Sequence, residues 1–142
     1  MQPIRILEMA AKCNHLVFVG DFFQVEFYYD ENQEIPIWEA YQGLTENEKV
    51  NFMTRVKKIA NTKPGVVHPK TILNLELPTD KVFALKFGQN RFCTFFAKGK
   101  KIIITNSYIK KSKKNTKVIN EKLKKAKKYK ADFENRVKNK TY

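Results

Sequence analysis

The chain has 142 residues, of which 42% are hydrophobic and 13% aromatic, and it carries a formal net charge of +14. This composition excludes a disordered polymer, the length suits a single domain with a buried core, and no run approaches the roughly 18 apolar residues of a membrane span. Cys13 and Cys93 follow no CxxC spacing, which argues against a disulfide framework or a zinc site, and we expect a soluble cytoplasmic protein without a secretory signal.

The first 29 residues indicate an N-terminal helix or arm followed by β structure. Residues 1–15 place a few apolar side chains loosely on one helical face, so we expect a short helix or an arm there, followed by one domain over residues 16–142. Residues 16–29 (LVFVGDFFQVEFYY) are rich in β-branched and aromatic side chains, which favours β structure. Gly20-Asp21 is expected to be a bulge or a break between two strands.

A helix is predicted after a loop that carries Pro36 and Trp38. Thr45 and Glu48 have the spacing of a capping box, in which each side chain binds the backbone N–H of the other residue. Apolar residues then recur at helical spacing up to Ala60, and Lys63-Pro64-Gly65 follows as a stop signal.

Three further strands are predicted over KVFALKF, RFCTFFAK and KIIITNSY, separated by turns at Gly88 and Gly99. The short turns favour an antiparallel meander. Together with the earlier strand and helix they predict an α+β fold with one antiparallel sheet, a helix or helical hairpin between the first and later strands, and a helix at the C-terminus.

The net charge is confined to the last third of the chain. Residues 1–97 carry 11 basic and 11 acidic side chains, whereas residues 98–142 carry 17 basic and three acidic ones. A field this uneven attracts polyanions, so nucleic acid is the first partner to consider. From Thr116 or Lys117 a long basic amphipathic helix is predicted, with a narrow apolar stripe of Ile119, Leu123, Ala126, Tyr129 or Lys130, Phe133 and Val137.

The predicted meander brings basic and aromatic residues to one end of the sheet. Arg91 opens the penultimate strand, whereas Tyr108 ends the last one and is followed at once by Lys110 and Lys111. Because neighbouring strands run in opposite directions, these residues should meet, and Lys86 should join them across the Gly88 turn. Neither of the two histidines belongs to a recognisable motif, and no metal site or glycine-rich phosphate loop is predicted.

This set of side chains suits RNA cleavage, because RNA carries its own nucleophile in the 2′-OH. Arg and Lys can stabilise charge on the phosphate, and a lysine of lowered pKa, or Tyr108, can transfer protons. Tyr108 can instead stack on a splayed base. The alternative is that Tyr108 only packs and that Lys110 and Lys111 form a solvated turn.

The C-terminal half resembles the RelE/ParE/HigB toxin superfamily, in particular its phage-derived HigB-like branch. That branch has an acidic-leucine-arginine strand, a tyrosine-arginine strand ending in a short turn, a last strand running into phenylalanine-x-lysine-lysine, and a helix rich in alanine and lysine. Segments of this chain follow in the same order: Ala84-Leu85-Lys86, Asn90-Arg91-Phe92, Lys98-Gly99, Tyr108-Ile109-Lys110-Lys111 and the helix after Lys117. The chain departs from this pattern at two positions. Ala84 stands in place of the strand acid, and Lys86 stands in place of the strand arginine. Lysine keeps the positive charge but lacks the paired N–H donors of a guanidinium group.

The resemblance implies the toxin of a type II toxin–antitoxin pair that cuts mRNA on the ribosome, without metal or cofactor, through attack by the 2′-OH. Its partners would be a cognate antitoxin protein, mRNA and ribosomal RNA, with no membrane. Arg91, Tyr108, Lys110 and Lys111 would form the catalytic site, and the RNA-binding residues would be Lys86, Lys113, Lys114, Lys124 and Lys128. Two alternatives remain open, a non-nuclease inhibitor of a host enzyme such as gyrase and a phage-encoded nucleic-acid-binding module without catalysis.

Overall fold

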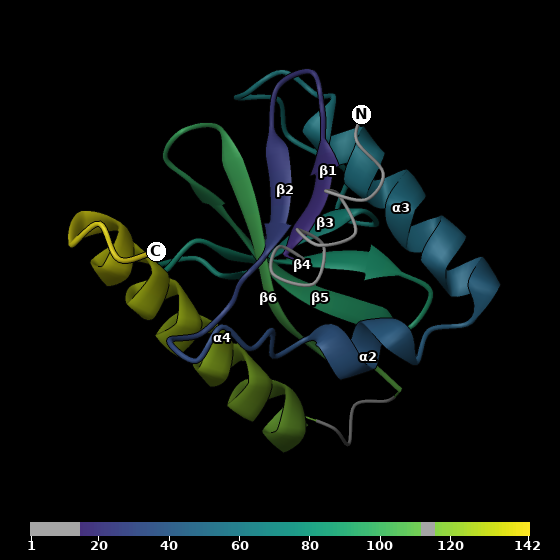
Figure 1. Ribbon diagram of the computed structural model, residues 1–142. Helices are drawn as coiled ribbons and strands as arrows, with labels where there is room; N and C mark the ends of the chain where they lie inside the picture. Colours follow the sequence, from purple (N-terminus) through teal and green to yellow (C-terminus); the bar gives the residue numbers. More distant parts are fainter. Residues whose placement is uncertain (1–14, 112–115) are drawn as a thin grey trace, which may run out of the picture.

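A six-stranded sheet forms the middle layer of the protein, with helices on both of its faces (Figure 1). The computed structural model describes residues 15–111 and 116–142. Helix α3 packs on one face of the sheet and helix α4 on the other, which gives an α+β fold in three layers. In chain order the elements are β1 (Leu16–Val19), β2 (Gln24–Phe27), α2 (Trp38–Gln42), α3 (Glu46–Ala60), β3 (Leu73–Leu77), β4 (Val82–Phe87), β5 (Asn90–Ala97), β6 (Lys101–Ile109) and α4 (Thr116–Lys138).

The sheet is mixed, and the expectation of an entirely antiparallel sheet is wrong. The strand order is β1-β2-β6-β5-β4-β3, and all neighbouring pairs are antiparallel except β2 and β6, which are parallel. The predicted meander is confirmed for β4, β5 and β6. The long connection through α2 and α3 lets the chain enter the sheet at its far edge, β3. Three hairpin reversals then bring β6 back beside β2 in the same direction.

Gly20 marks the predicted break between β1 and β2 and allows a close contact with the end of α3. The backbone N–H groups of Phe22 and Phe23 both donate to the carbonyl oxygen of Ala60, each at 3.0 Å. A Cβ atom on residue 20 would lie 2.5 Å from the Cβ of Ala60 and 2.6 Å from its carbonyl oxygen. Only glycine therefore fits where the strand break meets the helix.

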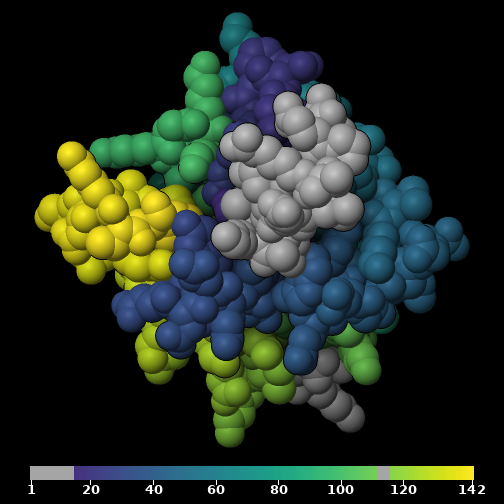
Figure 2. All heavy atoms as spheres, in the orientation of Figure 1, coloured from purple at the N-terminus to yellow at the C-terminus, as the bar shows by residue number. Residues whose placement is uncertain are grey.

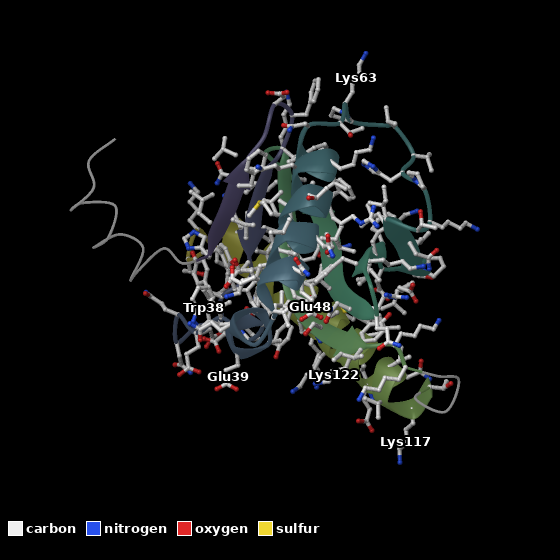
Figure 3. All side chains as sticks on the ribbon, turned by 90° about the vertical axis from the view of Figure 1, so that its right-hand side faces the viewer. Trp38, Glu39, Glu48, Lys63, Lys117 and Lys122 are labelled. Atoms are coloured by element: carbon white, nitrogen blue, oxygen red, sulfur yellow. The ribbon has the colours of Figure 1, made fainter. Side chains whose placement is uncertain are left out.

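Helix α3 follows the predicted capping box. The Glu48 backbone N–H donates to the Thr45 hydroxyl at 3.1 Å, and the Thr45 backbone N–H donates to the Glu48 carboxylate at 2.9 Å. Glu48, labelled in Figure 3, also accepts a hydrogen bond from Asn90 Nδ2 at 2.9 Å. This bond ties the first turn of α3 to the start of β5. The buried face of the helix consists of Phe52, Val56, Ile59 and Ala60.

Helix α4 covers the opposite face of the sheet, as its amphipathic pattern predicts. Leu123, Ala126 and Phe133 are buried against β4, β5, β6 and the residue after β2. One position of the predicted apolar stripe is wrong, because Val137 is 46% exposed and Arg136 is only 7% exposed. The buried side of the last helical turns is therefore partly ionic.

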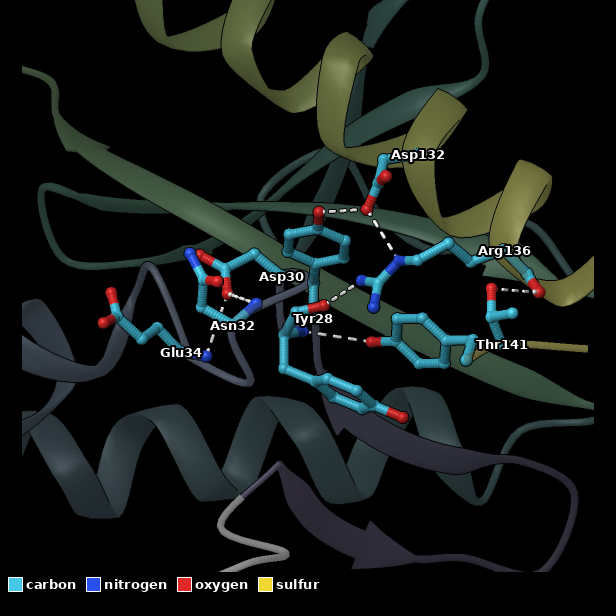
Figure 4. A network of polar contacts seen from close by, with 9 residues as sticks. Tyr28, Asp30, Asn32, Glu34, Asp132, Arg136 and Thr141 are labelled. Carbon is cyan, nitrogen blue, oxygen red and sulfur yellow. Dashed lines mark hydrogen bonds and ion pairs between the residues drawn. The ribbon is translucent and has the colours of Figure 1, made fainter.

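Arg136 is buried because it has partners on several sides (Figure 4). Its Nε donates to Asp132 Oδ2 at 2.9 Å, and the same carboxylate accepts the Tyr28 hydroxyl at 2.5 Å. Arg136 Nη2 donates to the Tyr29 carbonyl oxygen, and the guanidinium lies 4.5 Å from the ring centroid of Tyr142. Hydrogen bonds and aromatic contacts of this kind make a buried charge tolerable.

Charge is unevenly distributed over the surface. The segment from residue 30 to residue 48, which contains α2, has six acidic residues and no Lys or Arg. In Figure 2 this segment (blue) lies between the C-terminal part of α4 (yellow) and α3 (teal). The positive potential is therefore concentrated on α4 and its surroundings rather than spread over the whole protein.

Strand β3, which forms one edge of the sheet, was not predicted from the sequence. The short helix α2 lies in the predicted loop that carries Trp38, so the connection between the first and later strands contains two helices, a number that the helical-hairpin alternative allowed. The helix or arm predicted for residues 1–15 lies outside the described residues except for His15. No helix within the described part of the chain has the length and apolar content to cross a membrane.

Candidate functional site

Three of the predicted site residues lie side by side on neighbouring strands. The register places Lys86 of β4 opposite Arg91 of β5, and Arg91 opposite Tyr108 of β6. Residues paired in this way point to the same face of a sheet. That face is the one covered by α4, because Tyr108 packs in a cluster with Leu123 and Ala126. We call Lys86, Arg91 and Tyr108 the cross-strand row.

The turn between β4 and β5 holds the guanidinium of Arg91. Its Nη1 donates to the carbonyl oxygens of Gly88 and Asn90, at 2.8 and 3.0 Å. Within the described residues Nε and Nη2 have no such partner, so one side of the fork remains available to an external acceptor. A guanidinium fixed in this way is suited to bind two oxygens of a phosphate.

Lys86 has a pKa below the ordinary value for a lysine. Burial lowers the pKa most, the positive charge of Arg91 lowers it further, Glu76 opposes the shift and Lys110 adds to it. A lysine whose pKa is lowered can exchange a proton more readily near neutral pH. Among the predicted site residues, Lys86 is therefore a candidate for the lysine of lowered pKa that the sequence analysis considered for proton transfer.

Tyr108 is almost covered by α4. Its side chain is 6% exposed and packs with Val82, Cys93, Leu123 and Ala126. Burial raises the pKa of the phenol, and the negative charge of Glu76 raises it further. The hydroxyl therefore stays protonated at neutral pH and can donate a hydrogen bond. The covered ring leaves little area for a stacked base, which favours positioning over stacking.

Lys110 and Lys111 follow β6 directly and are both exposed. The backbone N–H of Lys110 donates to the Gln89 carbonyl oxygen at 2.9 Å, which holds the end of β6 against the β4–β5 turn. The charge of Lys110 contributes to the lowered pKa of Lys86. Lys110 therefore belongs to the neighbourhood of the cross-strand row, and Lys111 is the next residue outward.

Glu76 brings a carboxylate to this neighbourhood that the sequence predictions missed. It lies on edge strand β3, where Asn74 Nδ2 donates to Glu76 Oε2 at 2.5 Å. Its negative charge opposes the lowering of the Lys86 pKa and helps to raise the pKa of Tyr108, so it acts electrostatically on both side chains. In the β3–β4 register, however, Glu76 lies beside the start of β4 and not directly opposite Lys86. The available signal was the alternation in LNLEL at residues 73–77, which predicts a strand with the leucines on one face and Asn74 and Glu76 on the other.

The other predicted RNA-binding residues are not part of this cluster. Lys124 and Lys128 are exposed on the solvent side of α4, one helical turn apart. Lys117, in the first turn of the same helix, projects away from the body in Figure 3. Lys113 and Lys114 lie outside the described residues. The helix therefore offers a separate basic surface beside the row.

Cys93 is the buried neighbour of the row and has no reactive character. It is fully buried, and burial raises the pKa of its thiol to about 12. Among residues 15–111 and 116–142, no group of three or more His, Cys, Asp or Glu side chains is arranged to hold a metal ion. The polar side chains of the row and its surroundings are cations, a phenol and one carboxylate.

No protein-family model matches the chain, and no curated protein matches it significantly. The geometry alone indicates what the cluster can do. Arg91, Lys86 and Lys110 provide positive charge for a phosphate group, and Glu76 and Lys86 are candidates for the two proton transfers of a phosphodiester cleavage.

Proposed function

We propose that this protein is a growth-arresting toxin that cleaves mRNA on the ribosome, and that it belongs to the RelE/ParE/HigB superfamily. The observation that carries the proposal is the cross-strand row, in which β pairing places Lys86, Arg91 and Tyr108 next to one another at one end of the sheet. The order of the elements supports a RelE-like domain, because α3 precedes the meander and a basic helix follows its last strand.

The proposed reaction uses the 2′-OH of the RNA as its nucleophile. The 2′ oxygen attacks the neighbouring phosphorus and the bond to the 5′ oxygen breaks, which leaves a 2′,3′-cyclic phosphate and a 5′-OH. Glu76 accepts the proton of the 2′-OH, and Lys86 donates a proton to the departing 5′ oxygen.

The remaining residues bind and orient the phosphate. The Nε and Nη2 groups of Arg91 donate to its non-bridging oxygens, and the ammonium groups of Lys110 and Lys111 add positive charge. The Tyr108 hydroxyl donates a hydrogen bond that positions the reacting group. Because strands β5 and β6 hold Arg91 and Tyr108, these contacts are preorganised.

The basic surface of α4 supplies affinity for the ribosome. Lys124 and Lys128 face solvent, where they can neutralise phosphates of ribosomal RNA without base specificity. An antitoxin that neutralises the protein would be acidic where it covers this surface, since charge complementarity speeds association and selects partners.

A translation reaction with purified ribosomes and one defined mRNA tests this proposal. The wild-type protein should cut the mRNA and leave 2′,3′-cyclic phosphate ends, whereas Arg91→Ala should not. Lys98→Ala is the matched control, because it removes an exposed cation at the other end of β5. Expression of the protein in bacterial cells separates the two alternatives. Growth arrest with intact mRNA would support inhibition of a host enzyme, and the absence of growth arrest would support a nucleic-acid-binding module without catalysis.

A further inference from the structure

An open apolar groove lies on the face of the sheet opposite the cross-strand row. It has a volume of about 760 Å³, which falls within the usual range of binding sites. Its floor contains Phe23, Phe83 and Phe96, whose rings meet edge to face with centroid distances of 5.4 Å for Phe23–Phe96 and 5.6 Å for Phe83–Phe96. The connection between α3 and β3 forms one wall, and β3 itself forms another.

Exposed apolar side chains gather at this groove. Val66 is 53% exposed, Val67 91%, Leu75 39% and Phe96 37%, and all four line it. A single exposed valine on a protein surface is ordinary, but a continuous exposed apolar patch marks a binding surface. Strand β3 is also an edge of the sheet, so no further strand from the described part of the chain lies beside the wall that it forms.

The charge around the groove has one sign. Lys63 and Lys70 form a basic rim, and among the described residues no acidic one lines the groove. His68 also lines the groove, but its imidazole is mainly neutral at pH 7. Burial lowers the pKa of His68, and the nearby positive charge of Lys58 lowers it further. Lys63 lies at the opposite end of the molecule from Lys117 in Figure 3, so this rim is distinct from the basic surface of α4.

We propose that the groove binds an amphipathic, acidic segment of a partner protein, with its apolar side chains on the phenylalanine floor and its carboxylates at Lys63 and Lys70. The apolar floor of the groove matches the apolar face of such a segment, and the basic rim matches its acidic face. A nucleic acid backbone has no apolar face for this floor, and a second copy of the chain would bring another net charge of +14. The proposal does not depend on RNA cleavage, because the row lies on the other face of the sheet.

Synthetic peptides of about 16 residues, roughly four helical turns, test the proposal on the full-length protein. The first peptide has leucines on one helical face and glutamates on the other. The second has the same composition in an order that mixes the two faces, and the third has lysine in place of glutamate. The first should bind most tightly in fluorescence anisotropy, more weakly as salt is raised, and its binding should shift the aromatic NMR signals of Phe96.

Val67→Glu places a negative charge on an exposed side chain of the groove and should weaken binding of the first peptide roughly tenfold or more. Val50→Glu is the matched control, since Val50 is 62% exposed on α3 outside the groove lining, and it should bind as the wild type does. Both variants should cleave RNA as the wild type does if the protein is a nuclease, so the two proposals can fail separately.

Several results would overturn the proposal. If the first two peptides bind equally tightly, the protein attracts acidic peptides through surface lysines only. If the lysine peptide binds as tightly as the first peptide, the basic rim plays no part in binding. If Val67→Glu binds the first peptide as tightly as the wild type does, the peptide binds outside the groove. Sedimentation of the protein alone measures self-association. If the wild type self-associates and Val67→Glu does not, the groove binds a second copy of the chain instead.

Discussion

Arg91 lies directly opposite Tyr108 in the β5–β6 ladder, and its other neighbour in the sheet is Lys86 of β4. Two backbone carbonyl oxygens of the β4–β5 turn also hold its guanidinium. Strand pairing thus positions the backbone of the row, and the short turn fixes the guanidinium of Arg91; a precise site needs this kind of support. Substitution of Arg91, which is only partly buried, should therefore change chemistry more than it changes stability.

The paired N–H donors of the Arg91 guanidinium should be needed for mRNA cleavage. Arg91→Ala should lower the rate of mRNA cleavage about 100-fold or more, as expected when a donor to a developing charge is removed. Arg91→Lys should restore only part of the rate, because an ammonium group keeps the charge but not the paired donors. Single-turnover cleavage on stalled ribosomes gives the rates. A folded Arg91→Ala variant, shown by circular dichroism, that cleaves at the wild-type rate would exclude the proposed site.

The pKa of Lys86 should respond to its neighbours in two directions. The negative charge of Glu76 raises this pKa and the positive charge of Lys110 lowers it. Glu76→Gln should therefore lower the pKa of Lys86 further, and Lys110→Gln should raise it. Titration of ¹³Cε-labelled lysines by NMR measures both shifts, with exposed Lys124 as the reference.

The same pKa sets the pH dependence of cleavage. Lys86 must be protonated to act as the general acid, so the rate should fall as the pH rises through its lowered pKa. In Lys110→Gln this fall should move to higher pH. A pH–rate profile that stays the same in Lys110→Gln would remove Lys86 from the role of proton donor.

The ionic anchor at the end of α4 should contribute strongly to stability. Arg136→Ala removes the partner of Asp132 and the donor to the Tyr29 carbonyl oxygen, and it should lower the free energy of unfolding by about 3 kcal/mol. Lys128→Ala, on the exposed side of the same helix, should change it by less than about 0.5 kcal/mol. Urea unfolding followed by circular dichroism measures both. Equal effects of the two variants would show that the network in Figure 4 contributes little.

The contact between the β1–β2 break and α3 leaves no room for a side chain at Gly20. Gly20→Ala should lower the free energy of unfolding by roughly 1–3 kcal/mol, because its methyl group would overlap Ala60. The neighbouring substitution Val19→Ala affects a side chain that is 63% exposed and should be nearly neutral. Thermal unfolding of the two variants compares them, and a Gly20→Ala variant as stable as the wild type would contradict the close packing.

Local signals in the sequence predicted the elements that depend on local chemistry. The capping box of Thr45 and Glu48 and the turns at Gly88 and Gly99 are fixed by residues close together in the chain. The antiparallel pairing that follows from those turns also brought Arg91 and Tyr108 together in the prediction. These parts of the site were readable because consecutive hairpins determine their own register.

The features that the sequence did not predict depend on distant partners. The parallel pairing of β2 with β6 results from the path of the whole chain, and the edge strand that carries Glu76 is short and rich in leucine, which has no strong preference for strands. Arg136 took a buried position instead of Val137 because Tyr28 and Tyr29, more than 100 residues away, supply its environment. Periodicity of one helix carries no information about such partners.

The most direct test of mRNA cleavage by this protein is to induce the wild-type protein and Arg91→Ala at equal levels in a bacterial host and to map the 5′ ends of cellular mRNA. We expect growth arrest with new 5′ ends inside translated codons for the wild type, and neither effect for Arg91→Ala. Growth arrest by both proteins, or arrest by the wild type with intact mRNA, would contradict this expectation.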